Sequence, residues 1–198
     1  MVLPRIAWRM LSTTRPRLLW KFAWNFGFKG ANALRRHKRR LRRGIHYPPF
    51  LFMSITNACN LRCRGCWVTP SMPPQSLSLD AMRNAVRASR AFGCNFFGIL
   101  GGEPLMHEDL FELIETFPGS YFQVFTNGTF LTDAVARRMR ELGNVTPLVS
   151  IEGLRDESDR RRGGKDVYTA ARAAIECCRQ NRLVTGVATS VCRSNIDE

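Results

Sequence analysis

Apolar and polar positions follow one another along most of the chain in a repeating order of strand and helix. Short apolar runs predict strands buried on both faces, and longer stretches with apolar residues three or four positions apart predict amphipathic helices. Ser78 is the predicted N-cap of the first such helix. The predicted strands span 50–55, 95–100, 121–126, 145–151 and 183–191, and the predicted helices span 78–92, 108–117, 132–142 and 166–180.

This alternation predicts an α/β fold. Parallel strands need a crossover that is usually a helix, so strands that alternate with helices indicate a parallel sheet with right-handed connections. The alternation begins after Pro48-Pro49, and we assign residues 47–198 to one folded domain. Residues 1–46 have a different pattern and form a separate N-terminal arm.

The arm is predicted to be mostly helical, with a break at Pro16. Beyond the break, polar side chains recur every four residues and would form one stripe, with apolar side chains on the other side. The stripe consists of Arg17, Lys21, Asn25 and Lys29, and the apolar side of Leu18, Leu19, Phe22, Ala23 and Phe26. The arm also explains the net charge of +14, because residues 1–43 hold thirteen of the thirty Lys and Arg residues and no Asp or Glu.

The basic arm has several possible roles, which we rank. The first is a helix packed on the folded domain with a solvated basic tail. The second is peripheral contact with an anionic membrane surface, which a basic helix carrying tryptophans can make. Binding to nucleic acid and an organellar targeting role rank last. No stretch reaches the roughly 18 to 20 apolar residues that span a membrane, so we expect a cytoplasmic protein with at most a peripheral membrane contact.

Three of the seven cysteines lie in one loop, directly after the first predicted strand. Cys59, Cys63 and Cys66 follow a C-x3-C-x2-C spacing, so three thiolates can converge on one polynuclear site. An iron–sulfur cubane takes about one thiolate per iron, and with three cysteines one iron keeps a position for a ligand that is not protein. The alternative is a structural zinc site, which needs a fourth ligand from the remaining cysteines, Cys94, Cys177, Cys178 or Cys192.

Polar and glycine-rich motifs follow the later strands, at the end where βα barrels place their active sites. The second strand ends in Gly101-Gly102-Glu103-Pro104, in which glycines let a ligand approach the backbone and the carboxylate can bind an ammonium group. The third ends in Thr126-Asn127-Gly128, a composition typical of turns. The fourth ends in Ser150-Ile151-Glu152-Gly153, and Asp159-Arg160-Arg161-Arg162-Gly163 follows it.

Together these motifs resemble the signature of the radical S-adenosylmethionine (SAM) superfamily. The cysteine spacing and the Gly-Gly-Glu-Pro motif one βα unit later carry the resemblance. The Ser-Ile-Glu-Gly and Arg-Gly segments are most similar to the branch that contains peptide-modifying and sulfatase-maturing SPASM-type enzymes. The resemblance implies a [4Fe–4S] cluster on Cys59, Cys63 and Cys66, with the methionine moiety of SAM on the open iron.

The resemblance also implies roles for residues at the strand ends. Glu103 would fix the SAM amino group, Ser150 would orient the nucleoside or the carboxylate, and Arg162 would contact the carboxylate. The full set of cofactor-binding residues that it implies is Gly101, Gly102, Glu103, Pro104, Thr126, Asn127, Ser150 and Arg162.

The implied fold is a partial (β/α) barrel, which in this sequence is truncated after about the fifth strand, with a basic helical arm in front. The implied reaction is reductive cleavage of SAM to a 5′-deoxyadenosyl radical, which takes a hydrogen atom from an unidentified peptide or small-molecule substrate. The electron would come from a donor such as a flavodoxin or ferredoxin. The alternative is a non-catalytic metal-binding module whose basic arm contacts nucleic acid or a membrane.

Overall fold

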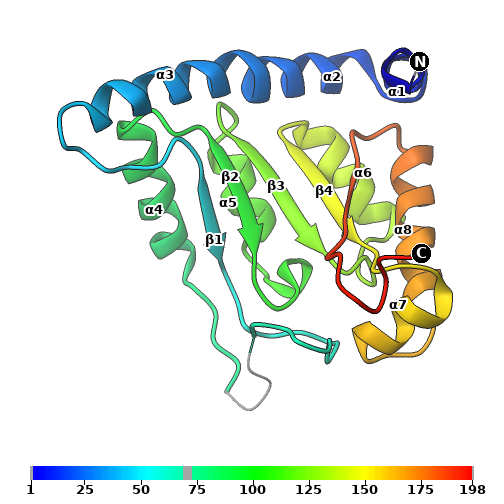
Figure 1. Cartoon of the computed structure of the whole chain (residues 1–198). Coiled ribbons are helices and arrows are strands. Elements are labelled where there is room, and N and C mark those ends of the chain that lie inside the picture. Colours follow the sequence, from blue (N-terminus) through cyan, green and yellow to red (C-terminus); the bar gives the residue numbers. More distant parts are fainter. Residues whose placement is uncertain (1, 69–72, 198) are drawn as a thin grey trace.

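The computed structural model describes residues 2–68 and 73–197 and contains one open, five-stranded parallel sheet (Figure 1). Each strand pairs with the next one along the chain, with Met53 opposite Ile99 and Phe125 opposite Leu148. The sheet confirms the predicted α/β fold. Its strands are β1 (Leu51–Ser54), β2 (Phe96–Leu100), β3 (Tyr121–Thr126), β4 (Val145–Ser150) and β5 (Gly186–Ala188).

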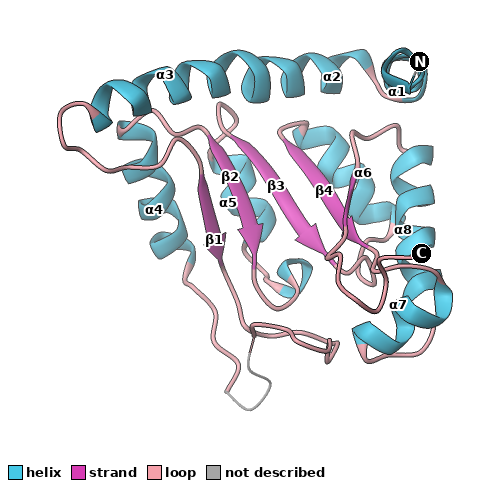
Figure 2. Ribbon diagram, in the orientation of Figure 1, coloured by secondary structure: helices cyan, strands magenta, loops and turns pink. Residues whose placement is uncertain are grey.

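Four helices cover one face of the sheet and enclose the apolar core (Figure 2). Every second residue of the inner strands points toward them, and Ile99, Phe122 and Val149 are fully buried there. This alternation follows from the pleat of a strand, which sends successive side chains to opposite faces. The helices are α4 (Leu79–Ala91), α5 (Leu110–Thr116), α6 (Asp133–Leu142) and α8 (Val167–Gln180).

The predicted helix boundaries are confirmed where a cap fixes them. The Oγ of Ser78 accepts the backbone N–H of Ala81 at 3.3 Å and so begins α4, as expected for an N-cap. Two elements differ from the prediction. The fifth strand shrinks to the three residues of β5, and the helix α7 (Arg155–Arg162) was not expected. Its sequence alternates acidic and basic residues without an apolar stripe, and that stripe is the signal on which helix prediction depends.

Among residues 2–68 and 73–197, no helix covers the opposite face of the sheet (Figure 2). Phe52 of β1 is 48% exposed on this face, and its ring lies directly over Gly98 of β2. A Cβ atom at Gly98 would lie 2.1 Å from that ring, so any larger residue there would require the half-exposed Phe52 side chain to move. This face continues toward the carboxyl ends of the strands, where Leu100, Phe125 and Ala188 line a cavity.

The N-terminal arm crosses the amino-terminal ends of the strands, at the edge of the sheet opposite to the cysteine loop (Figure 1). The predicted break lies just before Pro16, where the second helix begins. Leu18 is buried in the same core as the sheet helices, so one face of the arm packs on the folded domain. The arm consists of α1 (Val2–Thr13), α2 (Pro16–Phe22), the π-helix η1 (Ala23–Lys29) and α3 (Gly30–Leu41).

Lys21, Asn25 and Lys29 of the polar stripe face inward, whereas Arg17 is exposed, and the two lysines contact the carboxyl ends of the sheet helices. The Nζ atom of Lys21 donates to the carbonyl of Leu142 in α6 at 2.9 Å, and the Nζ atom of Lys29 donates to the carbonyl of Gly119 beyond α5 at 2.7 Å. Arg40 donates likewise to the carbonyl of the C-cap residue of α4. Cations at this end satisfy free carbonyls and complement the helix dipole. Burial in these contacts lowers the pKa of Lys21 and Lys29.

One buried phenol gives the fold a dependence on alkaline pH. Burial raises the pKa of Tyr121 to about 12, although its hydroxyl forms a hydrogen bond with Thr146 that acts in the opposite direction. Because the unfolded phenol ionises near pH ~10, its contribution to stability is complete below about pH 10 and is lost as the pH rises toward 12. We expect this loss to reach about 2–3 kcal/mol. Denaturant unfolding across this pH range should show it, and the variant Tyr121→Phe should remove it.

Candidate functional site

A cavity of about 820 Å³ opens at the carboxyl ends of the strands. Its size is within the range of pockets that hold small molecules and cofactors. The loop after β1 forms one side, and the ends of β2 to β5 with the last two residues of α7, Arg161 and Arg162, form other parts of the lining. The candidate residues that line it are Cys59, Cys63, Cys66, Gly101, Gly102, Thr126, Asn127, Ser150 and Arg162. The structure therefore brings together all the predicted site residues except Glu103 and Pro104.

The three cysteines of the loop after β1 are unpaired thiols. Cys59 and Cys63 are half-buried and Cys66 is exposed. Burial raises the pKa of Cys59 and of Cys63, and for Cys63 the nearby guanidinium of Arg162 acts in the opposite direction. As the side chains stand, no three His, Cys, Asp or Glu residues within 2–68 and 73–197 are gathered closely enough to hold a metal ion. Three free thiols that share one short loop and one cavity are nevertheless the donor set of a site-differentiated iron–sulfur cluster.

The glycine motif after β2 holds the cysteine loop by its backbone. The N–H of Gly102 donates to the carbonyl of Thr56 at 2.7 Å, and the N–H of Glu103 donates to the carbonyl of Ala58 at 2.8 Å. A Cβ atom at Gly102 would lie 2.1 Å from the Ala58 carbonyl oxygen. Gly101 has a φ of 153°, and a Cβ atom there would lie 2.5 Å from the Thr56 carbonyl oxygen. Both positions therefore need glycine for the loop to dock, whatever ligand the cavity receives.

The variant Gly102→Ala tests this docking. The added methyl group would collide with backbone atoms of the cysteine loop, and such overpacking typically costs about 1–3 kcal/mol. We expect the melting temperature to fall by about 5 °C, measured by circular dichroism. Gly27→Ala is the matched control, since nothing lies within 4 Å of a Cβ atom there. Equal melting temperatures for the two variants would contradict the docking role.

Glu103, for which the resemblance implies a contact with the SAM amino group, does not line the cavity. Its carboxylate is fully buried and accepts the backbone N–H of Leu105 at 3.1 Å, the hydroxyl of Thr126 at 2.7 Å and the backbone N–H of Asn127 at 2.7 Å. Burial raises its pKa, and these donors oppose the shift. The side chain therefore ties the turn after β2 to the end of β3. Pro104 is also buried and begins the short 3-10 helix η2 (Pro104–Met106).

The turn after β3 is joined to the cysteine loop through amide side chains. The Nδ2 atom of Asn127 donates to Oδ1 of Asn60 at 2.8 Å, and Nδ2 of Asn60 donates to the hydroxyl of Thr129 at 2.9 Å. That hydroxyl in turn donates to Oδ1 of Asn127. Asn60 lies between the first two cysteines of the loop, so this closed ring of hydrogen bonds fixes the loop from its second side.

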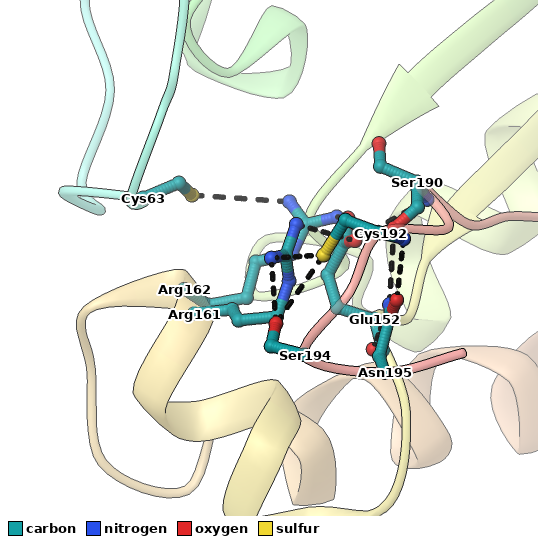
Figure 3. A network of polar contacts seen from close by, with 8 residues as sticks. All are labelled: Cys63, Glu152, Arg161, Arg162, Ser190, Cys192, Ser194 and Asn195. Atoms are coloured by element: carbon teal, nitrogen blue, oxygen red, sulfur yellow. Dashed lines mark hydrogen bonds and ion pairs between the residues drawn. The ribbon is translucent and has the colours of Figure 1, made fainter. Parts of the chain in front are cut away.

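The end of β4 carries a buried charge network that sequence analysis assigned no joint role (Figure 3). At its centre, the Glu152 carboxylate accepts from Nη2 of Arg162 at 2.6 Å and pairs with Nη2 of Arg161 at 3.5 Å. The Nη1 atom of Arg162 lies 3.9 Å from the sulfur of Cys63. Glu152 therefore aims a positive charge at the cysteine loop from across the cavity.

The chain beyond β5 completes this network. The side-chain amide of Asn195 donates to the backbone carbonyl of Glu152 at 2.6 Å. The backbone N–H of Ser190 donates to the Glu152 carboxylate at 3.2 Å. Nη1 of Arg161 donates to the sulfur of Cys192 at 2.7 Å. The sequence signal for this cluster was the recurrence of charged residues after β4, but only the fold shows that they meet.

The comparison with protein families decides the assignment. Residues 53–195 match the radical SAM superfamily. The chain belongs to this superfamily. The radical SAM match covers the sheet, the cysteine loop and the charge network, and it begins after the arm. Radical SAM proteins use a [4Fe–4S] cluster and SAM, and the thiols, the backbone of the glycine turn and the cavity described above fit both groups.

The relatives of this radical SAM chain include proteins of different kinds. It is 30% identical over 156 residues to the AdoMet-dependent heme synthase of Methanosarcina barkeri, a match that covers 76% of this chain and 45% of that protein. It is 28% identical over 149 residues to the sporulation killing factor maturation protein SkfB of Bacillus subtilis, which covers 74% of this chain and 36% of SkfB. The chain thus spans less than half the length of these relatives.

Among solved structures, anSMEcpe with bound AdoMet has the same fold. The TM-score is 0.60 at 19% identity, over 70% of this chain and 42% of that one. The predicted partial barrel of the radical SAM type is therefore confirmed for the five strands that the structure describes.

Proposed function

We propose that this chain is the catalytic core of a radical SAM enzyme. When bound, the cluster and SAM supply a 5′-deoxyadenosyl radical, which abstracts a hydrogen atom from the substrate. The observation that carries the proposal is the placement of three unpaired thiols in the same cavity as the glycine turn and Arg162.

Each part of the cavity has a proposed task. Cys59, Cys63 and Cys66 hold the cluster. The exposed backbone of Gly101 and Gly102 receives the SAM amino group, while Glu103 and Pro104 fix that turn from behind. Ser150 faces the nucleoside, Arg162 provides the positive charge for the SAM carboxylate, and Thr126 and Asn127 close the side at β3.

The substrate is a peptide or a small molecule that donates a hydrogen atom. The printed name of SkfB, a maturation protein for a sporulation killing factor, supports a peptide, whereas the heme synthase supports a small molecule. The electron would come from a small redox protein such as a flavodoxin or ferredoxin.

Anaerobic reconstitution with iron and sulfide tests the proposal. The purified chain should turn brown, bind about four iron ions and, with dithionite and SAM, release 5′-deoxyadenosine. Liquid chromatography of the reaction measures this product. A colourless protein that holds zinc and leaves SAM intact would instead support a non-catalytic metal-binding module, and it would refute the proposal.

A further inference from the structure

The outward face of the arm carries a row of exposed aromatic rings. Trp20, Trp24 and Phe28 are 67%, 40% and 60% exposed and lie four residues apart along α2 and η1. Their rings stack on one another, with centroids 5.9 Å apart for the first pair and 4.5 Å apart for the second. In α1, Trp8 and Leu11 are also exposed, at 72% and 64%. Apolar side chains in this number on one surface segment need a partner.

Cations further along the arm, in α3 and directly after it, are free to meet that partner. The inward cations are occupied by helix carbonyls, as described above, but others are exposed and make no ion pair within the residues that the structure describes. No acidic residue occurs in residues 1–43 to neutralise them. The exposed cations beyond the ring row are Arg35, Lys38, Arg39, Arg42 and Arg43.

We propose that the outward face of the arm binds an anionic lipid surface. A helix lies in the interfacial plane of a membrane when it combines tryptophan or phenylalanine with Lys and Arg, and the cations add attraction to acidic headgroups. Trp20 and Trp24 have the amphipathic rings that prefer the headgroup region. Among residues 2–68 and 73–197 no helix is long and apolar enough to cross a bilayer, so the contact proposed is peripheral.

The ring geometry favours lipid over nucleic acid. Proteins that bind single-stranded nucleic acid offer open ring faces on which bases stack, together with a groove that follows the backbone. Here the planes of Trp24 and Phe28 are 16° apart, and those of Trp20 and Trp24 are 23° apart. The rings therefore cover one another's faces and present their edges, a surface that suits insertion among lipid headgroups.

The position of the arm is compatible with this contact. It lies across the amino-terminal ends of the strands, whereas the cavity opens at their carboxyl ends (Figure 1). A membrane bound at the arm would therefore leave the cavity accessible. The proposal does not depend on the proposed enzymatic function, because the arm contributes no residue to the cavity.

Co-sedimentation of the full chain with vesicles tests the proposal. We expect at least about tenfold more binding to vesicles of phosphatidylglycerol and phosphatidylcholine than to phosphatidylcholine alone, with a decrease at high salt. Tryptophan fluorescence should shift to shorter wavelength on binding. The triple variant Trp20→Ser, Trp24→Ser, Phe28→Ser should lose most of the binding while keeping the circular dichroism spectrum of the folded chain.

Two charge-matched double variants test whether binding requires the arm or only a basic surface anywhere on the chain. Arg39→Gln with Arg42→Gln should weaken binding several-fold, whereas Arg87→Gln with Arg172→Gln, two exposed arginines on α4 and α8, should leave it unchanged. Equal effects of the two pairs would overturn the proposal. Binding to a single-stranded oligonucleotide without binding to anionic vesicles would overturn it as well and would assign the arm to nucleic acid.

Discussion

Replacement of Glu152 by alanine is expected to lower the melting temperature by about 10 °C. The substitution leaves Arg161 and Arg162, whose side chains are only 17% and 13% exposed, without their shared carboxylate. Removing one partner of a buried ion pair costs about 3–5 kcal/mol, because the other charge stays buried and uncompensated. For a chain of this length each kcal/mol corresponds to about 2–4 °C. Thermal unfolding followed by circular dichroism measures the change.

The variant Glu176→Ala is the matched control for this prediction. Glu176 also pairs with an arginine, Arg179, but at an exposed position of α8, where ion pairs contribute about 0–1 kcal/mol. Its melting temperature should stay close to that of the natural chain. A Glu152→Ala variant that melts like this control would show that the network does not stabilise the site.

Replacement of Cys63 by alanine is expected to remove nearly all iron from the reconstituted chain. Three thiolates are the minimum for a cubane with one open corner, and among the residues lining the cavity only Cys59 and Cys66 would remain. Iron analysis should fall from about four per chain to near zero, and formation of 5′-deoxyadenosine should fall to background.

Cys177→Ala is the control for this loss. Cys177 is a half-buried thiol in α8 and does not line the cavity, so its replacement should change neither the iron content nor the product. Full iron content in Cys63→Ala would mean that another thiol serves the cluster. Cys192, which Arg161 connects to the network around Glu152, would then be the next to replace.

Much of the fold was predictable because its signals are local. The apolar run of 121–126 and the capping serine before α4 each depend on neighbouring residues alone, and both were placed correctly. The cysteine spacing was equally local, and the order of the strands brought the motifs that follow them to one edge of the sheet. Nine of the eleven predicted site residues therefore line one cavity.

The features of the site that the sequence did not predict depend on contacts between distant segments. Glu103 has the residue type for binding an ammonium group, but its carboxylate accepts from Thr126 and Asn127 at the end of β3 and from Leu105 in its own turn, and these donors hold it inside. The network of Glu152 joins residues up to 99 positions apart, from Cys63 to Arg162. The residues next to Glu103 and Glu152 in the sequence do not indicate which way either side chain points. The packing of one loop on another sets that direction.

The π-helix in the arm keeps two stripes of side chains in line along the segment. Wide turns take more residues per revolution than the 3.6 of an α-helix, so side chains spaced by four stay in line through Ala23–Lys29. Two stripes rely on this phase, the inward Lys21 and Lys29 and the outward rings. Both stripes therefore depend on the wide turns of this one segment, because α-helical turns alone would rotate residues spaced by four by about 40° at each step.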